Sequence, residues 1–272
     1  MKLSILTATY NRADYLEKLY NSILDNLKTS NLKVEWIIIN DGSTDNTEEI
    51  IDKFVLENKF EIKYLYQENS GKMVAINRAM KEVTGEMIVD CDSDDFFTEN
   101  AFKTIEQNEL RLIENKNLYA LCFLKQDLIG NVSGKKFPIN YMESTMFDLY
   151  FKQDIQGEKI LVFNTKIRIK YKHELEKNEK FITEARMYHK MDETYKILCV
   201  NEVIEIGDYK EDGYTKNIIK TFKANPNGYF NFFKEILKKD LKGVLFKKKG
   251  YILKHLIYFY ILKNLKNNVS SM

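Results

Sequence analysis

The chain has 272 residues, with 44% hydrophobic and 30% charged side chains and a net charge of +2, as is ordinary for a folded globular protein. Three scattered cysteines and three scattered histidines argue against a structural zinc site, and two prolines argue against a proline-rich stalk. The longest apolar stretch, 251–262, is shorter than the ~20 residues that span a bilayer.

The first hundred residues alternate between strand-like and helix-like segments. Residues 2–9 are expected to form a strand and not a signal peptide, because their apolar run is short. Further strands are predicted at 34–39, 62–66 and 87–89, and helices at 12–27, 44–57 and 73–83. This alternation predicts an α/β fold, a Rossmann-like, mostly parallel central sheet with helices on both faces.

The remaining residues give a weaker pattern. Strands are expected at 118–124 and 195–206, and helices at 99–114, 147–151, 164–173, 183–191, 215–223, 229–239 and 251–265. Each of the three cysteines, Cys91, Cys122 and Cys199, lies in an apolar segment. We therefore expect buried reduced thiols, which suit the cytoplasm.

Four carboxylates follow the strand predicted at 87–89, namely Asp90, Asp92, Asp94 and Asp95. Buried carboxylates are costly unless they are paired or bind a metal. Asp92 and Asp94 are two residues apart, so on extended backbone they point the same way and could hold a divalent cation with a diphosphate. The alternative is an acidic turn that caps the next helix.

Polar loops follow the first, second and fourth predicted strands, at residues 9–11, 41–43 and 92–95. The carboxyl ends of parallel strands lie at one edge of a sheet, which is where open α/β sheets bind ligands. We therefore expect the three loops to converge on one ligand.

Four segments in this order, Thr7–Arg12, Asn40–Asp45, Asn69–Lys72 and Asp92–Asp95, resemble the motifs of the family-two glycosyltransferases of the GT-A fold, which invert the anomeric carbon. The resemblance is strong over residues 1–100 and looser to about 217. It implies a GT-A catalytic domain at 1–217, with a nucleotide-binding half (1–100) and an acceptor-binding half (101–217).

The resemblance also implies roles for single residues. Thr7, Thr9 and Asn11 match the loop that lies along the nucleotide base, and Asp41 matches the acid that accepts a hydrogen bond from uracil. A carboxylate is suited to that N–H donor. Locally, Asp41 could equally open an Asx-type turn before Gly42.

Two further segments are implied to lie around the donor. Gly71 and Lys72 precede a helix, so free N–H groups and a cation would face the nucleotide. Asn77 matches a position near the nucleotide, although it could equally be a solvated helix residue.

Within the acidic segment, Asp92 is implied to lie near the ribose or the metal. Asp94 is implied to ligate the Mn²⁺ or Mg²⁺ ion that holds the donor diphosphate, and Asp95 to orient the sugar or the metal shell. Asp90 is left without a role.

An inverting transferase needs a base for the acceptor hydroxyl. Glu184 resembles the family's acid that opens a helix after a hydrophobic pair, although the family commonly has a second acid where Ala185 stands. An acid in a first helical turn can also be a surface residue favoured by the helix dipole. Asp212, in Glu211–Gly213, is a rival base.

The implied reaction moves a sugar from a UDP-hexose to a hydroxyl of a glycan or lipid-linked acceptor in bacterial surface-polysaccharide synthesis. One alternative is a sugar-nucleotide nucleotidyltransferase, whose usual Gly-rich signature after the first strand is absent from Tyr10–Ala13. Another is a non-catalytic nucleotide-sugar-binding scaffold. No nucleic-acid recognition module is present in the sequence.

The C-terminal region, 218–272, is expected to be basic and helical. From Lys220 onward twelve lysines face two acids, a net charge of +10, which leaves −8 on the rest of the chain because the total is +2. Such a tail could lie on an anionic membrane or pack on the domain with its lysines in water. The expected location is cytoplasmic, with peripheral contact at the inner face of the membrane as one alternative.

Overall fold

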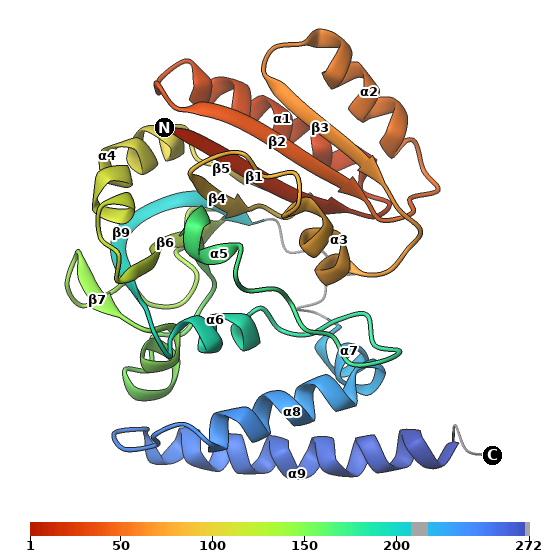
Figure 1. The fold of residues 1–272 in the computed structure, drawn as a ribbon, viewed down its shortest axis with the longest axis vertical. Coiled ribbons are helices and arrows are strands. Elements are labelled where there is room, and N and C mark those ends of the chain that lie inside the picture. Colours follow the sequence, from red (N-terminus) through yellow and green to blue (C-terminus); the bar gives the residue numbers. More distant parts are fainter. Residues whose placement is uncertain (208–216, 270–272) are drawn as a thin grey trace.

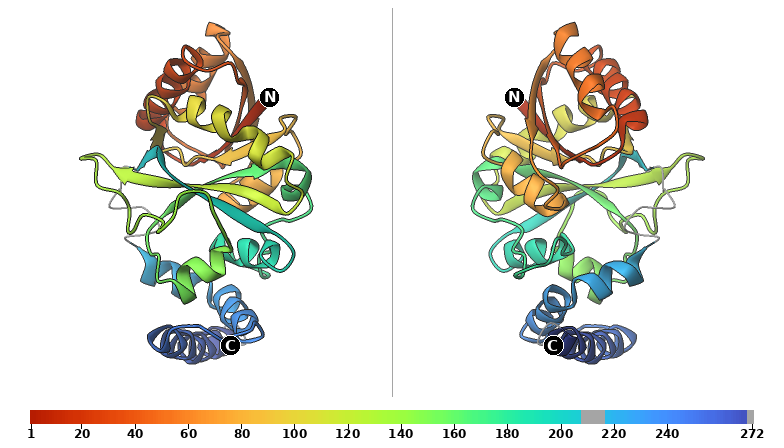
Figure 2. Two further views of the ribbon diagram at one scale, coloured as in Figure 1. Left: turned by 90° about the vertical axis from the view of Figure 1, so that its left-hand side faces the viewer. Right: turned by 90° about the vertical axis from the view of Figure 1, so that its right-hand side faces the viewer.

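The computed structural model describes residues 1–207 and 217–269, with side chains up to residue 266. A single large sheet lies at its centre, with helices on both faces (Figure 1). A further layer of helices lies at the end of the molecule opposite the N-terminal helices, as both views in Figure 2 show.

The strands in the described part of the chain are β1 (Lys2–Thr9), β2 (Lys33–Asn40), β3 (Glu61–Tyr66), β4 (Met87–Asp90), β5 (Asp95–Phe97), β6 (Leu118–Asp127), β7 (Met142–Ser144), β8 (Lys159–Asn164) and β9 (Lys196–Gly207). They form one sheet in the order β3-β2-β1-β4-β8-β6-β9-β5, and β7 also pairs with β9. Strands β3, β2, β1 and β4 are mutually parallel. The predicted α/β fold is confirmed, although antiparallel pairs make the second half of the sheet mixed.

The helices are α1 (Ala13–Leu27), α2 (Thr47–Glu57), α3 (Lys72–Ala79), α4 (Ala101–Ile113), α5 (Thr165–Arg168), α6 (Ala185–Met191), α7 (Ile218–Ala224), α8 (Pro226–Leu237) and α9 (Phe246–Val269), with a π-helical turn at Asp148–Lys152. Within the described ranges, none of them is both long enough and apolar enough to cross a bilayer.

Alternate side chains of the central strands enter two separate cores, because successive residues of a strand point to opposite faces. Ile5, Trp36 and Val89 belong to the core beneath α1, α2 and α4. Leu6 and Ile88 belong to the core on the face that α3 and α6 cover. Burial on both faces explains why these strands are near-continuous apolar runs.

A third core joins the C-terminal helices to the rest of the chain. Phe232 and Phe233 of α8 pack with Phe147, Phe181 and their neighbours. The salt bridge between Arg186 of α6 and Glu235 of α8 lies beside this core. Helix α8 is therefore covered on one side by the body of the molecule and on the other by α9 (Figure 1).

One predicted helix is much shorter than expected, and one strand has no local signal in the sequence. The helix expected at 164–173 is only the single turn α5; turn hydrogen bonds follow it, and the backbone of His173 then exchanges two hydrogen bonds with the side chain of Asn77. Strand β5 was not predicted; it forms by antiparallel pairing with the distant end of β9.

Candidate active site

The loops after β1 and β2 are tied together at the carboxyl edge of the sheet. The backbone N–H of Asn11 donates to Ser43 Oγ (3.0 Å), and Asn11 Oδ1 accepts from the N–H of Thr44 (2.8 Å). Asn11 has a φ of 51°, a left-handed conformation that asparagine tolerates better than most residues. The loops after β1 and β2 are therefore in contact at the edge where ligand binding is predicted.

Asp41 lies at the same edge but is only 3% exposed. Its carboxylate accepts hydrogen bonds from Gln67 Nε2 (2.7 Å) and from the backbone N–H groups of Ser70 and Gly71 (both 2.8 Å). The turn after β2 is instead held by Asn40, whose Oδ1 accepts from Ser43. Asp41 thus fixes the loop before α3, and about one of its four acceptor positions remains for a ligand.

Gly71 occupies a position that other residues could not adopt without strain. Its φ is 96°, and a Cβ there would lie 2.3 Å from the carbonyl oxygen of Lys180. This close approach brings the segment before α6 against the first turn of α3. Lys72, the first residue of α3, consequently faces the N-terminus of α6.

Lys72 connects the two halves of the candidate site. Its Nζ lies 2.7 Å from Asp92 Oδ1 and 3.1 Å from Glu184 Oε1. Burial would lower the pKa of Lys72, but the charges of Asp92 and Glu184 raise it well above its usual value. Burial raises the pKa of Asp92, and the nearby cations, Lys72 first, outweigh burial and lower it.

Glu184 is the residue that precedes α6, and its side chain makes no capping hydrogen bond to that helix. Its carboxylate is 31% exposed and is directed to Lys72. Glu184 therefore lies at the N-terminus of α6, where the helix dipole favours an acid, and also beside the acidic segment after β4. The rival base Asp212 lies outside the described residues.

Three carboxylates after β4 could hold a metal ion. One oxygen from each of Asp92, Asp94 and Asp95 lies within 4.8 Å of the others. Hard divalent cations such as Mg²⁺ and Mn²⁺ prefer such oxygen ligands, so the donor set fits the predicted ion. Burial raises the pKa of Asp94, and the neighbouring charge of Asp92 raises it further, as expected where like charges share a site.

A buried lysine that sequence reasoning missed supports this cluster. Lys125 of β6 lies 2.5 Å from Asp95, 3.1 Å from Glu158 and 3.3 Å from Glu205. Burial raises the pKa of Asp95 to about 6 in spite of the lysine. The sequence shows only a lysine after an apolar run. It does not indicate that this lysine pairs with acids, because all three acids are distant in sequence.

Two predicted nucleotide-binding residues have other contacts in the structure. Thr7 is fully buried, where its hydroxyl donates to the carbonyl of Cys91 (2.9 Å) and accepts from Trp36 Nε1 (2.9 Å). Asn77 uses its amide to hold the backbone of His173. Thr9 is 1% exposed, and its hydroxyl has no hydrogen-bond partner among the described residues.

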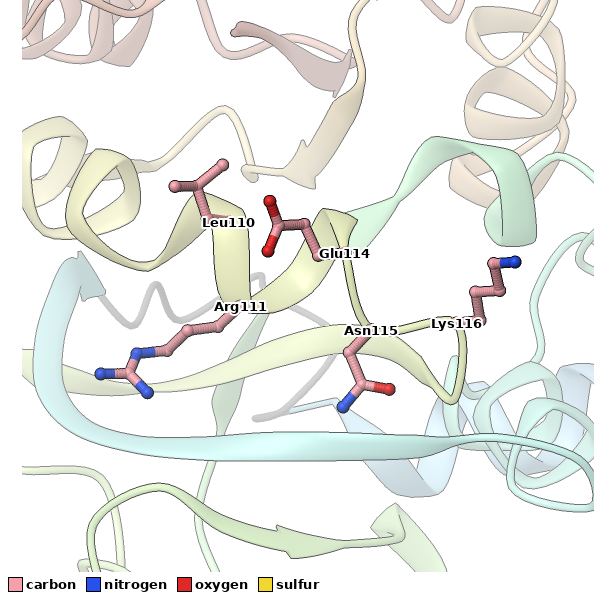
Figure 3. A pocket seen from close by; sticks show the side chains of 5 residues that line it. All are labelled: Leu110, Arg111, Glu114, Asn115 and Lys116. Carbon is pink, nitrogen blue, oxygen red and sulfur yellow. The ribbon is translucent and has the colours of Figure 1, made fainter.

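A surface depression of about 640 Å³ lies away from these groups, at the end of α4 (Figure 3). It is lined by Leu110, Arg111, Glu114, Asn115 and Lys116. None of the predicted site residues lines it. We therefore assign the chemistry to the carboxyl edge of the sheet.

Comparison with known proteins finds sequence similarity in the first part of the chain. Residues 4–108 match the model of glycosyl transferase family 2. Over 110 residues the chain is 36% identical to an uncharacterized glycosyltransferase of Mycoplasma genitalium, covering 39% of this chain and 37% of that protein. Over 94 residues it is 37% identical to TuaG of Bacillus subtilis, a putative teichuronic acid biosynthesis glycosyltransferase, covering 34% and 36%. The chain thus spans little more than a third of the length of these relatives.

Similarity to solved structures extends further along the chain. The crystal structure of S. aureus TarS in complex with UDP-GlcNAc aligns with a TM-score of 0.60 at 21% identity, covering 96% of this chain and 72% of that one. At this identity the likeness concerns the fold. It confirms the predicted GT-A type of α/β architecture.

Proposed function

We propose that the chain is an inverting glycosyltransferase, because residues 4–108 match the model of glycosyl transferase family 2. It moves a hexose from a UDP-sugar to a hydroxyl of a glycan or lipid-linked acceptor in surface-polysaccharide synthesis. The names of TuaG and of the TarS complex with UDP-GlcNAc support the pathway and the donor class. The three free, buried cysteines support a cytoplasmic location, and a lipid-linked acceptor would be met at the inner face of the membrane.

The observation that carries this proposal is the salt-bridge network through Lys72. Asp92 belongs to the family-2 segment and Glu184 does not, yet one ammonium group contacts both. The network holds a carboxylate from the second half of the chain beside the acidic cluster. This juxtaposition supports residues 1–217 as one catalytic unit, with donor binding at 1–100 and acceptor binding at 101–217.

Each group has a chemical task in the proposed reaction. Asp92, Asp94 and Asp95 hold Mn²⁺ or Mg²⁺, which when bound neutralises charge on the donor diphosphate. Lys72 adds a second positive charge for the departing UDP. Glu184 accepts the proton of the acceptor hydroxyl as that oxygen attacks the anomeric carbon from the side opposite UDP, a contribution of ~10²–10⁴-fold to the rate.

The other donor-site residues act mainly by fixing the backbone of the loops around the donor. Asp41 and Gly71 fix the loop that carries Lys72, and Asp41 retains an acceptor position for uracil N3–H. Asn11 ties the loops after β1 and β2 together. In the proposed complex, the nucleotide base lies between these loops and the acidic cluster.

The test compares Glu184→Gln with wild type on a panel of UDP- and GDP-sugars, with and without Mn²⁺. We expect the variant to bind UDP at least as tightly as wild type, because Lys72 loses a competing carboxylate, and to lose transfer by at least about 10²-fold. The control is Glu193→Gln, which changes an exposed acid paired with Lys239 just after α6.

Asp94→Asn should lose the increase in UDP affinity that Mn²⁺ gives to wild type.

Retained turnover in Glu184→Gln would move the base elsewhere. Release of pyrophosphate from UTP and a sugar 1-phosphate would instead favour a nucleotidyltransferase. UDP-sugar binding without hydrolysis or transfer for any donor would favour a binding scaffold.

A further inference from the structure

Helix α9 presents two apolar faces, and only one of them is covered. On the inner face, Ile252 and Phe259 are fully buried. Phe259 stacks on Tyr229 and Phe233 of α8, with ring centroids 5.0 and 5.7 Å apart. This face accounts for the attachment of α9 to the rest of the molecule.

The outer face carries an apolar stripe. Its members are Phe246 (92% exposed), Leu253 (54%), Ile257 (53%), Tyr260 (56%) and Ile261 (52%). Spacings of three, four and seven residues place them on one side of the helix. The stripe is about 22 Å long at 1.5 Å per residue. An exposed apolar patch of this extent usually marks an interaction surface.

Unneutralised positive charge borders the stripe. Lys249 precedes Leu253 by four residues and Lys254 precedes Ile257 by three, so both stems lie beside the stripe. Both lysines are exposed, and neither forms an ion pair within the described residues. No aspartate or glutamate occurs anywhere in α9.

This charge pattern distinguishes between two partners that could cover the exposed stripe of α9. A second copy of the chain, docked stripe to stripe, would bring lysine rows together without acids to pair them. A bilayer with anionic lipids provides both an apolar interior for the stripe and negative headgroups for the lysines. Long lysine stems can keep their charges at the headgroups while the stripe is immersed.

We propose that the outer face of α9 lies in the surface of an anionic membrane, parallel to its plane. Helix α9 is the outermost layer at one end of the described part of the chain, and no other described helix lies beyond it in the views of Figures 1 and 2. Among the described residues it is also not apolar enough to cross the bilayer. This surface is separate from the candidate active site, so the test does not depend on turnover.

The test measures binding of the full chain to vesicles of phosphatidylcholine, alone or with roughly 30% phosphatidylglycerol. Wild type should bind the anionic vesicles at least about tenfold more tightly, and added salt should weaken that binding. A Leu253→Ser/Ile257→Ser variant and a Lys249→Glu/Lys254→Glu variant should each lose at least about tenfold. The matched control is Leu128→Ser/Ile129→Ser, two apolar residues that are 52% and 84% exposed after β6.

Several results would overturn the proposal. They are equal binding to both vesicle types, unchanged binding in either α9 variant, or an equal loss in the Leu128→Ser/Ile129→Ser control. A dimer in solution that Leu253→Ser/Ile257→Ser dissociates, without vesicle binding by wild type, would assign the stripe to a second copy. Thermal unfolding of each variant checks that folding is retained, and the charge variant leaves the apolar stripe intact if the serine variant fails to fold.

Discussion

Lys72 is the residue on which the two halves of the candidate site meet. Its ammonium neutralises Asp92 and Glu184 at once, so neither carboxylate is left uncompensated before substrates bind. A UDP diphosphate would compete for the same cation, and its arrival would release Glu184 to accept a proton. In the proposed mechanism, the lysine would thereby couple donor binding to the availability of the base.

Replacement of Lys72 by methionine keeps the length of the side chain and removes its charge. We expect kcat/KM to fall by about 10²–10³-fold, because the departing diphosphate loses a fixed positive charge. Affinity for UDP should fall as well. The control is Lys180→Met, since Lys180 lies nearby but donates to Asn69 and not to a carboxylate. Steady-state kinetics and UDP titration check both variants, and equal losses in the two would contradict a specific role for Lys72.

Contiguous motifs made part of this site predictable at the residue scale. Asp92, Asp94 and Lys72 lie within segments whose order along the chain resembles a known family. The contacts of Lys72 with Glu184 and of Lys125 with Asp95 join residues far apart in sequence, so no periodic pattern reports them. The two amide hydrogen bonds of Asn77 to His173 were hidden for the same reason.

At the scale of elements, a buried acid holds the sheet together at the edge opposite the site. Glu35 of β2 is 0% exposed. It accepts from Ser4 of β1, from Thr84 before β4 and from Lys63 of β3. Burial alone would raise its pKa, but these hydrogen bonds and the lysine charges outweigh burial and hold the pKa well below the ordinary 4.5.

This depressed pKa predicts sensitivity to acid. The ionised Glu35 stabilises the fold fully above pH 4.5, and that stabilisation is lost as the pH falls below 4.5 toward the folded-state pKa. Glu35→Gln should lower the free energy of unfolding at pH 7 by about 2–3 kcal/mol. Its stability should also change less than that of wild type between pH 5 and pH 3. Urea unfolding at several pH values measures this, with the exposed Glu49→Gln as control; parallel curves for wild type and Glu35→Gln would contradict it.

Local periodicity explains which elements could be predicted. Strands β1, β2 and β3 and helix α1 lie within about one residue of their expected bounds, because each has a continuous pattern of its own. Strand β5 has three residues and depends on β9 for its hydrogen bonds. Helix α5 ends at Arg168, and its backbone is followed by turn hydrogen bonds before His173 contacts α3, a long-range contact that periodicity does not report.

On the scale of the whole molecule, the two long helices of the basic tail pack differently. Helix α8 joins the third core, and Glu179 accepts hydrogen bonds from the N–H groups of Asn227 and Gly228 in its first turn (both 2.8 Å). Helix α9 packs on α8 and leaves its other face exposed. Helix α8 has one lysine and one glutamate, whereas α9 has six lysines and no acid, but both are apolar, and composition does not report which apolar face another element covers.

Truncation at two points should therefore have different consequences. A chain that ends at Leu245 lacks α9 and should keep a cooperative unfolding transition and UDP binding, while losing binding to anionic vesicles.

A chain that ends at Asn225 also lacks α8 and exposes the core around Phe147 and Phe181. Four buried side chains of α8, Tyr229, Phe232, Phe233 and Ile236, contribute roughly 1.5–3 kcal/mol each, a sum comparable with the net stability of a typical domain. The shorter chain should consequently not fold, as calorimetry and circular dichroism would report. A cooperative transition in the shorter chain would mean that the catalytic unit is independent of α8.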